Sequence, residues 1–243
     1  RRYILHIIIV LCVYGGLFGL GLWYINEYAL EPDDLTNMLC FLSGFPIMDI
    51  YDIDRHMILM WIFSVAMVYV LTGAKVYERV NSLRYIAMIR YGSYARFYRN
   101  LVNLTVVHSF VYASLGVVIT FTMYGLWGNG MVSPAVLVRI WIIYYARIVM
   151  LCLMQTVCML LSGGYMAGLV ILLVSIFGAV CGHWILESGW IWLPVNWGMY
   201  ARSRDVISGG VPPVLQYMQV VVDMILWVCM PTAAERIIHY GRA

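Results

Sequence analysis

Six apolar stretches take up most of this chain, and they constrain its fold more than any other feature. A helix needs about 20 mainly apolar residues to cross the hydrocarbon core of a bilayer, with a range of roughly 17 to 25. Charged residues make up only 11% of the 243 residues, against about 25% in soluble domains. The sequence therefore predicts an all-α integral membrane protein with six transmembrane helices, forming a single transmembrane domain over residues 1–243. The predicted spans are Tyr3–Ile25, Met57–Gly73, Leu101–Leu126, Ala135–Leu161, Tyr165–Gly182 and Val214–Pro231.

The links between these stretches differ in charge, which predicts the orientation of the chain. Cytoplasmic loops of membrane proteins carry an excess of Lys and Arg. The two terminal segments and the link Ala74–Asn100 together hold ten Lys and Arg residues against two acidic residues. The links Asn26–His56 and His183–Pro213 hold three Arg residues against nine acidic residues. We therefore expect both termini in the cytoplasm. Because the first residue is Arg1 rather than Met, we also expect further residues before it.

The sequence RYIAMIRYGSYARFYRN, residues 84–100, holds four arginines and four tyrosines inside the basic link. Asn81 and Ser82 are residue types that cap helix starts, and Gly92 is typical of a helix end. We predict a short helix over Leu83–Tyr91 that lies along the membrane, followed by a turn into an extended third span. Two interpretations stay open: the arginines contact lipid phosphates and set the topology, or the short helix docks on a cytoplasmic partner. Nothing else in the chain supports nucleic-acid binding.

Three charged residues lie within the predicted spans, where each costs about 2.5 to 3.5 kcal/mol at the helix centre, so such residues usually pair or face the interior. Counted from the outer ends of their spans, Arg147 lies about 18 Å deep and Asp223 about 14 Å deep. We predict an ion pair between them. Gln216, Gln219 and Asp223 share one face of the last span. The candidate intramembrane residues either hold helices together or line a substrate path; they are Arg139, Arg147, Gln155, Gln216, Gln219 and Asp223.

The outer segment His183–Ser203 is rich in tryptophan and is neither a clean span nor a polar loop. Tryptophan is enriched where the membrane meets water, and Pro194 interrupts any continuous helix. We predict short re-entrant or surface-lying helices that cap the outer mouth of the protein. A simple aromatic anchor is the alternative. The candidate cap residues are Trp184, Trp190, Trp192 and Trp197.

The residue types that carry enzyme or metal chemistry are scattered along the chain. No CxxC pair is present, and the five His residues have no partner at metal-ligand spacing. The chain lacks the GxxxxGK[ST] loop that binds ATP phosphates. Ser162 lies at a turn and His239 lies beyond the last span, so no pair of nucleophile and base is evident. We expect neither an enzyme nor a bound metal or cofactor. The alternatives are a sensor or assembly subunit without transport activity and, less favoured, an intramembrane enzyme.

The six-span layout and two segments, RYGSYARFYR (90–99) and LPVNWGMYARS (193–203), resemble one family. It is the membrane (permease) subunit of bacterial ABC-2 type ABC exporters, and the resemblance is to small permeases of peptide or bacteriocin export and self-protection systems. The acidic outer link Asn26–His56 is longer than in many members. The resemblance implies export of a peptide or an amphipathic, lipid-like substrate across the bacterial cytoplasmic membrane.

The resemblance also implies partners. ATP and Mg²⁺ would be bound by a separate cytoplasmic ATPase subunit, and a second permease chain, identical or related, would complete the substrate path. The short helix after the second span would be a coupling helix that contacts the ATPase. The residues implied in that contact are Arg84, Tyr85, Met88, Arg90 and Tyr91.

Overall fold

The computed structural model describes residues 2–27, 39–47, 54–91, 93–127, 133–162 and 164–240. Six long helices make up most of it, and four short helices lie between them. The long helices are α1 (Arg2–Glu27), α4 (Arg55–Tyr91), α5 (Tyr94–Trp127), α6 (Pro134–Ser162), α7 (Tyr165–Leu186) and α9 (Pro213–Tyr240). The short helices are α3 (Cys40–Ser43), η1 (Glu187–Trp192), α8 (Pro194–Trp197) and η2 (Tyr200–Arg202).

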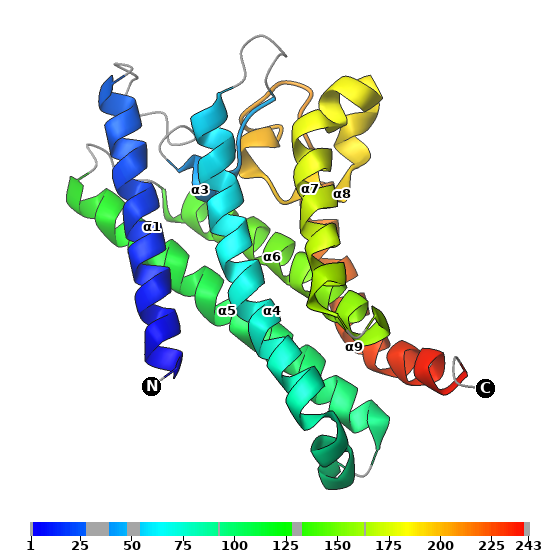
Figure 1. The fold of residues 1–243 in the computed structure, drawn as a ribbon. Coiled ribbons are helices and arrows are strands. Elements are labelled where there is room, and N and C mark those ends of the chain that lie inside the picture. The colour runs from blue at the N-terminus through cyan, green and yellow to red at the C-terminus, as the bar shows by residue number, and fades with distance from the viewer. Residues whose placement is uncertain are drawn as a thin grey trace.

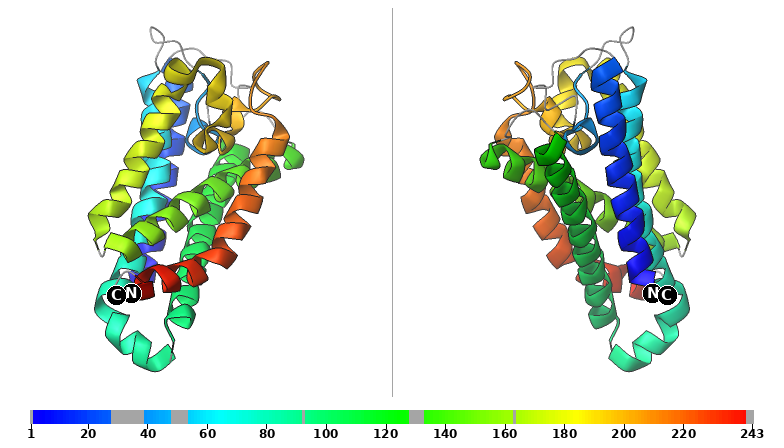
Figure 2. Two further views of the ribbon diagram at one scale, coloured as in Figure 1. Left: turned by 90° about the vertical axis from the view of Figure 1, so that its right-hand side faces the viewer. Right: turned by 90° about the vertical axis from the view of Figure 1, so that its left-hand side faces the viewer.

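The long helices alternate in direction, so that α1 begins and α9 ends at the same end of the bundle (Figures 1 and 2). We call this end the base. It also holds the end of α4 and the start of α5. The opposite end carries η1, α8 and η2, with α3 inserted among the long helices beside them, and we call it the cap.

Five of the long helices are long and apolar enough to cross a membrane. They cover Ile4–Tyr24, Arg55–Asn81, Ala95–Leu126, Pro134–Ser162 and Pro213–Ala233, and they match five of the six predicted spans. The remaining prediction, Tyr165–Gly182, falls on α7, whose apolar part among the described residues is the shorter run Gly168–Gly182.

The surface of the bundle is apolar where a soluble protein would be polar. Large apolar side chains are exposed along all six long helices, and they include Ile8 and Leu20 on α1, Met166 and Phe177 on α7, and Val221 and Val228 on α9. Extended apolar surface of this kind needs lipid or a partner to cover it. Together with the five spans, this surface establishes a helical integral membrane protein.

The connection at the base differs from the prediction in one respect. The backbone of α4 stays helical from Arg55 to Tyr91, so the predicted new helix does not start at Asn81 and Ser82. Both residues are tolerated inside a helix, and no Gly or Pro interrupts the chain between Ala74 and Tyr91. Figure 2 shows the last turns of α4 bending across the base before the chain enters α5. Gly92 lies outside the described residues.

The start of α5 follows the prediction more closely. Ser93 precedes the helix, and its hydroxyl oxygen accepts a hydrogen bond from the backbone N–H of Arg96 at 3.3 Å. This bond satisfies one of the free N–H groups of the first turn. The third span is thus extended at its base end, because α5 already begins at Tyr94 and continues to Trp127.

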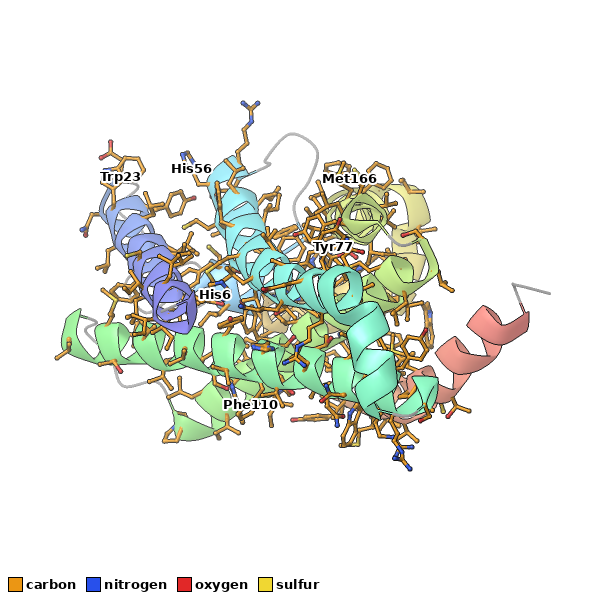
Figure 3. All side chains as sticks on the ribbon, turned by 60° about the horizontal axis from the view of Figure 1, so that its bottom comes forward. His6, Trp23, His56, Tyr77, Phe110 and Met166 are labelled. Carbon is orange, nitrogen blue, oxygen red and sulfur yellow. The ribbon has the colours of Figure 1, made fainter. Side chains whose placement is uncertain are left out.

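Polar contacts and close packing join α1 to the centre of the bundle. His6 on α1 lies 2.7 Å from the Tyr112 hydroxyl on α5 (Figure 3). The hydroxyl groups of Tyr14 and Tyr144 lie 2.5 Å apart. The ring of Tyr14 packs directly on Gly116, where a Cβ atom would lie 2.2 Å from a ring carbon. Helix α5 therefore approaches α1 as closely as a glycine allows.

Candidate functional site

Arg202 organises the cap. Its side chain is 2% exposed and donates from Nε to the Phe45 carbonyl at 3.2 Å, and from Nη2 to the Ala179 carbonyl at 2.8 Å. Nη1 donates to the Asn196 side-chain oxygen, and the guanidinium lies 4.7 Å from the Phe45 ring centroid. Burial lowers the pKa of Arg202 to about 9, which leaves it charged at neutral pH. One cation thus joins the segment after α3, the helix α7 and the helix α8.

The four candidate tryptophans have different environments in and beside the cap. Trp190 is buried, and Trp184 is partly buried. The Trp197 indole N–H donates to the Ile191 carbonyl at 2.7 Å, which ties α8 back to η1. Trp192 is 69% exposed and is therefore the one of the four that is free to contact lipid or a partner. After the end of α7, the tryptophan-rich segment forms the short helices η1, α8 and η2.

Arg139 and Gln216 meet beneath the cap. Arg139 forms an ion pair with Asp205 and donates from Nη2 to the Gln216 side-chain oxygen at 3.0 Å. The Gln216 amide in turn donates to the Met199 carbonyl at 3.3 Å, and the Arg139 guanidinium lies 5.5 Å from the Tyr200 ring centroid. This network connects α6 and α9 to the cap.

Arg147 is completely buried in the middle of α6. None of its three guanidinium nitrogens has a hydrogen-bond partner among the described residues. The guanidinium lies between two rings instead, 5.2 Å from the Trp61 centroid and 5.1 Å from the Tyr144 centroid. Its aliphatic part packs against Gly198, where a Cβ atom would lie 2.4 Å from the Arg147 Cβ. The cation therefore supports the cap from below through the backbone of Gly198.

The structure does not form the predicted ion pair between Arg147 and Asp223. Within the described part of the chain, both carboxylate oxygens of Asp223 also lack a hydrogen-bond partner. Arg147 and Asp223 lie at similar depths, but Arg147 is not on the side of α6 that faces Asp223. That side is formed by Tyr145 and Val149. Residues two apart on a helix are separated by about 200°. Depth alone was therefore an insufficient basis for the pair.

Asp223 lines a pocket of about 400 Å³ between α5, α6 and α9. The aspartate is 7% exposed. It is the acidic residue of the lining, and the other lining residues are apolar or aromatic. Phe110 on α5 (Figure 3) packs behind these walls, with its ring centroid 5.9 Å from that of Trp141 and 5.3 Å from that of Tyr145. The lining residues are Val106, Trp141, Ile142, Tyr145, Ala146, Val149, Val220, Asp223, Met224 and Trp227.

The two remaining glutamines lie buried between helices. Gln155 is buried between α4 and α7, where a Cβ atom on Gly73 would lie 2.2 Å from its amide nitrogen and one on Gly168 would lie 2.8 Å from its Cγ. Gln219 is also buried, and its amide lies 3.8 Å from the Met150 sulfur. Neither residue lines the pocket.

The predicted coupling residues lie in the last turns of α4, at the base. The side chains of Arg84, Tyr85, Met88, Arg90 and Tyr91 lie outside the described part of the structure. Their backbone is helical and belongs to the bent end of α4 (Figure 2).

Sequence reasoning found the polar residues of α9 but missed Arg202 as a structural centre. It counted Arg202 only as one of the outer charges. The sequence signal that could have indicated a buried Arg202 was Asn196, which lies in the same tryptophan-rich segment. A buried Arg needs hydrogen-bond acceptors such as the Asn side-chain oxygen.

Long apolar helices with an apolar outer surface define this chain as a multi-pass membrane protein. Comparisons with family models, with curated proteins and with solved structures give no match.

Proposed function

We propose that this chain is the transmembrane permease subunit of an ATP-driven exporter of the ABC-2 type. The observation that carries the proposal is the hairpin formed by α4 and α5, which turns at the base (Figure 1). Helix α4 has 37 residues and α5 has 34, which correspond to lengths of about 55 Å and 51 Å. A hydrocarbon core is about 30 Å thick, so both helices are longer than a perpendicular crossing requires, and the last turns of α4 bend across the base (Figure 2).

The base end of this hairpin holds six of the fifteen Lys and Arg residues of the chain. Its basic residues are Lys75, Arg79, Arg84, Arg90, Arg96 and Arg99, which favours a cytoplasmic position for the base. In this orientation the alternating helices, α7 included, make six crossings with both ends in the cytoplasm. A basic segment whose backbone is continuous with two spans is suited to transmit movement from a cytoplasmic ATPase to the membrane domain.

The cap closes the opposite end of the bundle. Short helices held by Arg202 and by the Arg139 network lie where a substrate would leave or enter on the outer side. The proposal includes a second permease chain, identical or related, and a peptide or amphipathic, lipid-like cargo. Its location would be the bacterial cytoplasmic membrane.

Gentle affinity purification from native membranes tests the proposal, with mass spectrometry of the chains that stay bound at near-equal stoichiometry. A soluble chain with a phosphate-binding GxxxxGK[ST] loop is the expected partner. The double variant Arg84→Ala, Arg90→Ala should lose it. The control Arg55→Ala, Arg204→Ala removes the same charge at the cap end and should retain it. Purification of the wild type alone, or with membrane proteins only, would refute the exporter and favour a sensor or assembly subunit.

A further inference from the structure

Asp223 is a buried carboxylate without a counter-ion in this chain's described residues. Arg139 is engaged with Asp205 and Gln216. Arg147 lies between Trp61 and Tyr144, on another side of α6. Neither carboxylate oxygen of Asp223 has a hydrogen-bond partner in the part of the chain that the structure describes. A carboxylate in such a position is costly unless a cation neutralises it. The missing charge must therefore come from outside the described residues or from a proton.

The pocket beside Asp223 is suited to an organic cation. Its volume of about 400 Å³ falls in the range of small-molecule sites, roughly 300–1,000 Å³. Three aromatic residues, Trp141, Tyr145 and Trp227, contribute to its walls. Aromatic ring faces attract cations, most strongly where water is excluded. The other lining residues are apolar and would cover an apolar body attached to the charged group.

The opening of the pocket indicates how a ligand enters. Met224 is 60% exposed and Trp227 is 46% exposed, and both lie on the part of α9 that spans the membrane, Pro213–Ala233. Asp223 lies near the middle of that span. A ligand therefore reaches Asp223 from within the bilayer, which excludes a small hydrated ion and favours a molecule that dissolves in lipid.

We propose that the pocket between α5, α6 and α9 binds an amphipathic organic cation, an ammonium or similar group on an apolar skeleton, with Asp223 as its counter-ion. The pocket by itself supports binding. The further step, that such a cation is the transported cargo, rests on the proposed exporter function.

The test uses the purified full chain in phosphatidylcholine nanodiscs with radiolabelled tetraphenylphosphonium as the probe. Nanodiscs without protein control for partition into lipid, and tetraphenylborate, with a similar shape and the opposite charge, tests whether the site requires a cation. We expect saturable binding of the phosphonium at one site per chain and none of the borate. Asp223→Asn should weaken phosphonium binding by about thirtyfold or more, as when one partner of a buried charge pair is removed. Glu78→Gln removes an acid distant from the pocket and should leave binding unchanged.

A second variant separates the pocket from the charge. Val220→Trp fills the space beside Asp223 and keeps the carboxylate, so it should also reduce phosphonium binding. Equal phosphonium binding by the wild type and Asp223→Asn would overturn the proposal. Absence of saturable binding by the wild type would overturn it as well. Because the nanodiscs contain no ATPase, this result is independent of the purification experiment that tests the exporter function.

Discussion

Replacement of Arg202 by methionine should open the cap without unfolding the bundle. Methionine fills a similar apolar volume but donates no hydrogen bond. The wild-type guanidinium donates to the Phe45 carbonyl, the Ala179 carbonyl and the Asn196 side chain. Bonds from a charged donor contribute about 1.5–3 kcal/mol each, so three give roughly 5–9 kcal/mol. Release of a buried charge returns several kcal/mol. The expected net loss in the stability of the closed cap is about 3 kcal/mol.

Cys40 provides the assay. It is fully buried in α3, close to the Phe45 carbonyl that Arg202 holds, and burial raises the pKa of its thiol to about 12. The closed cap therefore protects this thiol from reagents that attack the thiolate. With the other five cysteines replaced by alanine, labelling of Cys40 measures the population of the open cap. A loss of about 3 kcal/mol increases the labelling rate about a hundredfold.

Two further variants make this prediction specific. Arg204→Met removes a neighbouring exposed arginine whose side chain donates from Nε to the Gly210 carbonyl at 3.3 Å, and it should leave the labelling rate within about twofold of wild type. Arg202→Lys keeps the charge but lacks the planar fork that reaches three acceptors, so labelling should still accelerate. The reasoning is refuted if Arg202→Met labels as slowly as the wild type, or if Arg204→Met labels as fast as Arg202→Met.

Three other predictions follow from the packing. Gly116→Ala should lower the stability by about 1–3 kcal/mol, because the new Cβ would meet the Tyr14 ring. Gly125→Ala places its Cβ in open space and should be neutral in thermal unfolding. Equal effects of the two variants would contradict the close approach of α1 and α5. Arg147→Met and Asp223→Asn should be additive in the same assay to within about 0.5 kcal/mol, and a larger coupling would show that the two charges interact after all. Asp205→Asn should cost at most about 1 kcal/mol, since the Arg139–Asp205 pair is partly exposed, and a loss above 3 kcal/mol would show that the pair is essential to the cap.

The spans were predictable because length and composition decide membrane insertion almost alone. Five of the six predicted stretches coincide with helices that meet the requirement for crossing. The polar face of α9 was equally accessible, since Gln216, Gln219 and Asp223 follow helical spacing and all are buried. In each case the signal is local to one helix and needs no knowledge of its neighbours.

Features that depend on the rotation of one helix against another were not predictable. Arg147 and Asp223 matched in depth, but the side of α6 that faces α9 is set by packing with α4 and α5. Asn81 and Ser82 were read as the start of a helix, although the same residues are tolerated in its interior when the flanking turns are strong helix formers. Arg202 resembled an ordinary loop charge, because its acceptors at Phe45 and Ala179 are distant in sequence.

The central claim is that the bent end of α4 contacts a cytoplasmic ATPase, and site-specific photocrosslinking in native membranes tests it most directly. A photoreactive amino acid at Met88 should yield a covalent adduct with a soluble chain that carries a GxxxxGK[ST] loop. The same amino acid at Trp192, exposed in the cap, should give no such adduct. A Met88 derivative that crosslinks only to lipid or to membrane proteins, in cells where the chain is correctly inserted, would contradict the account.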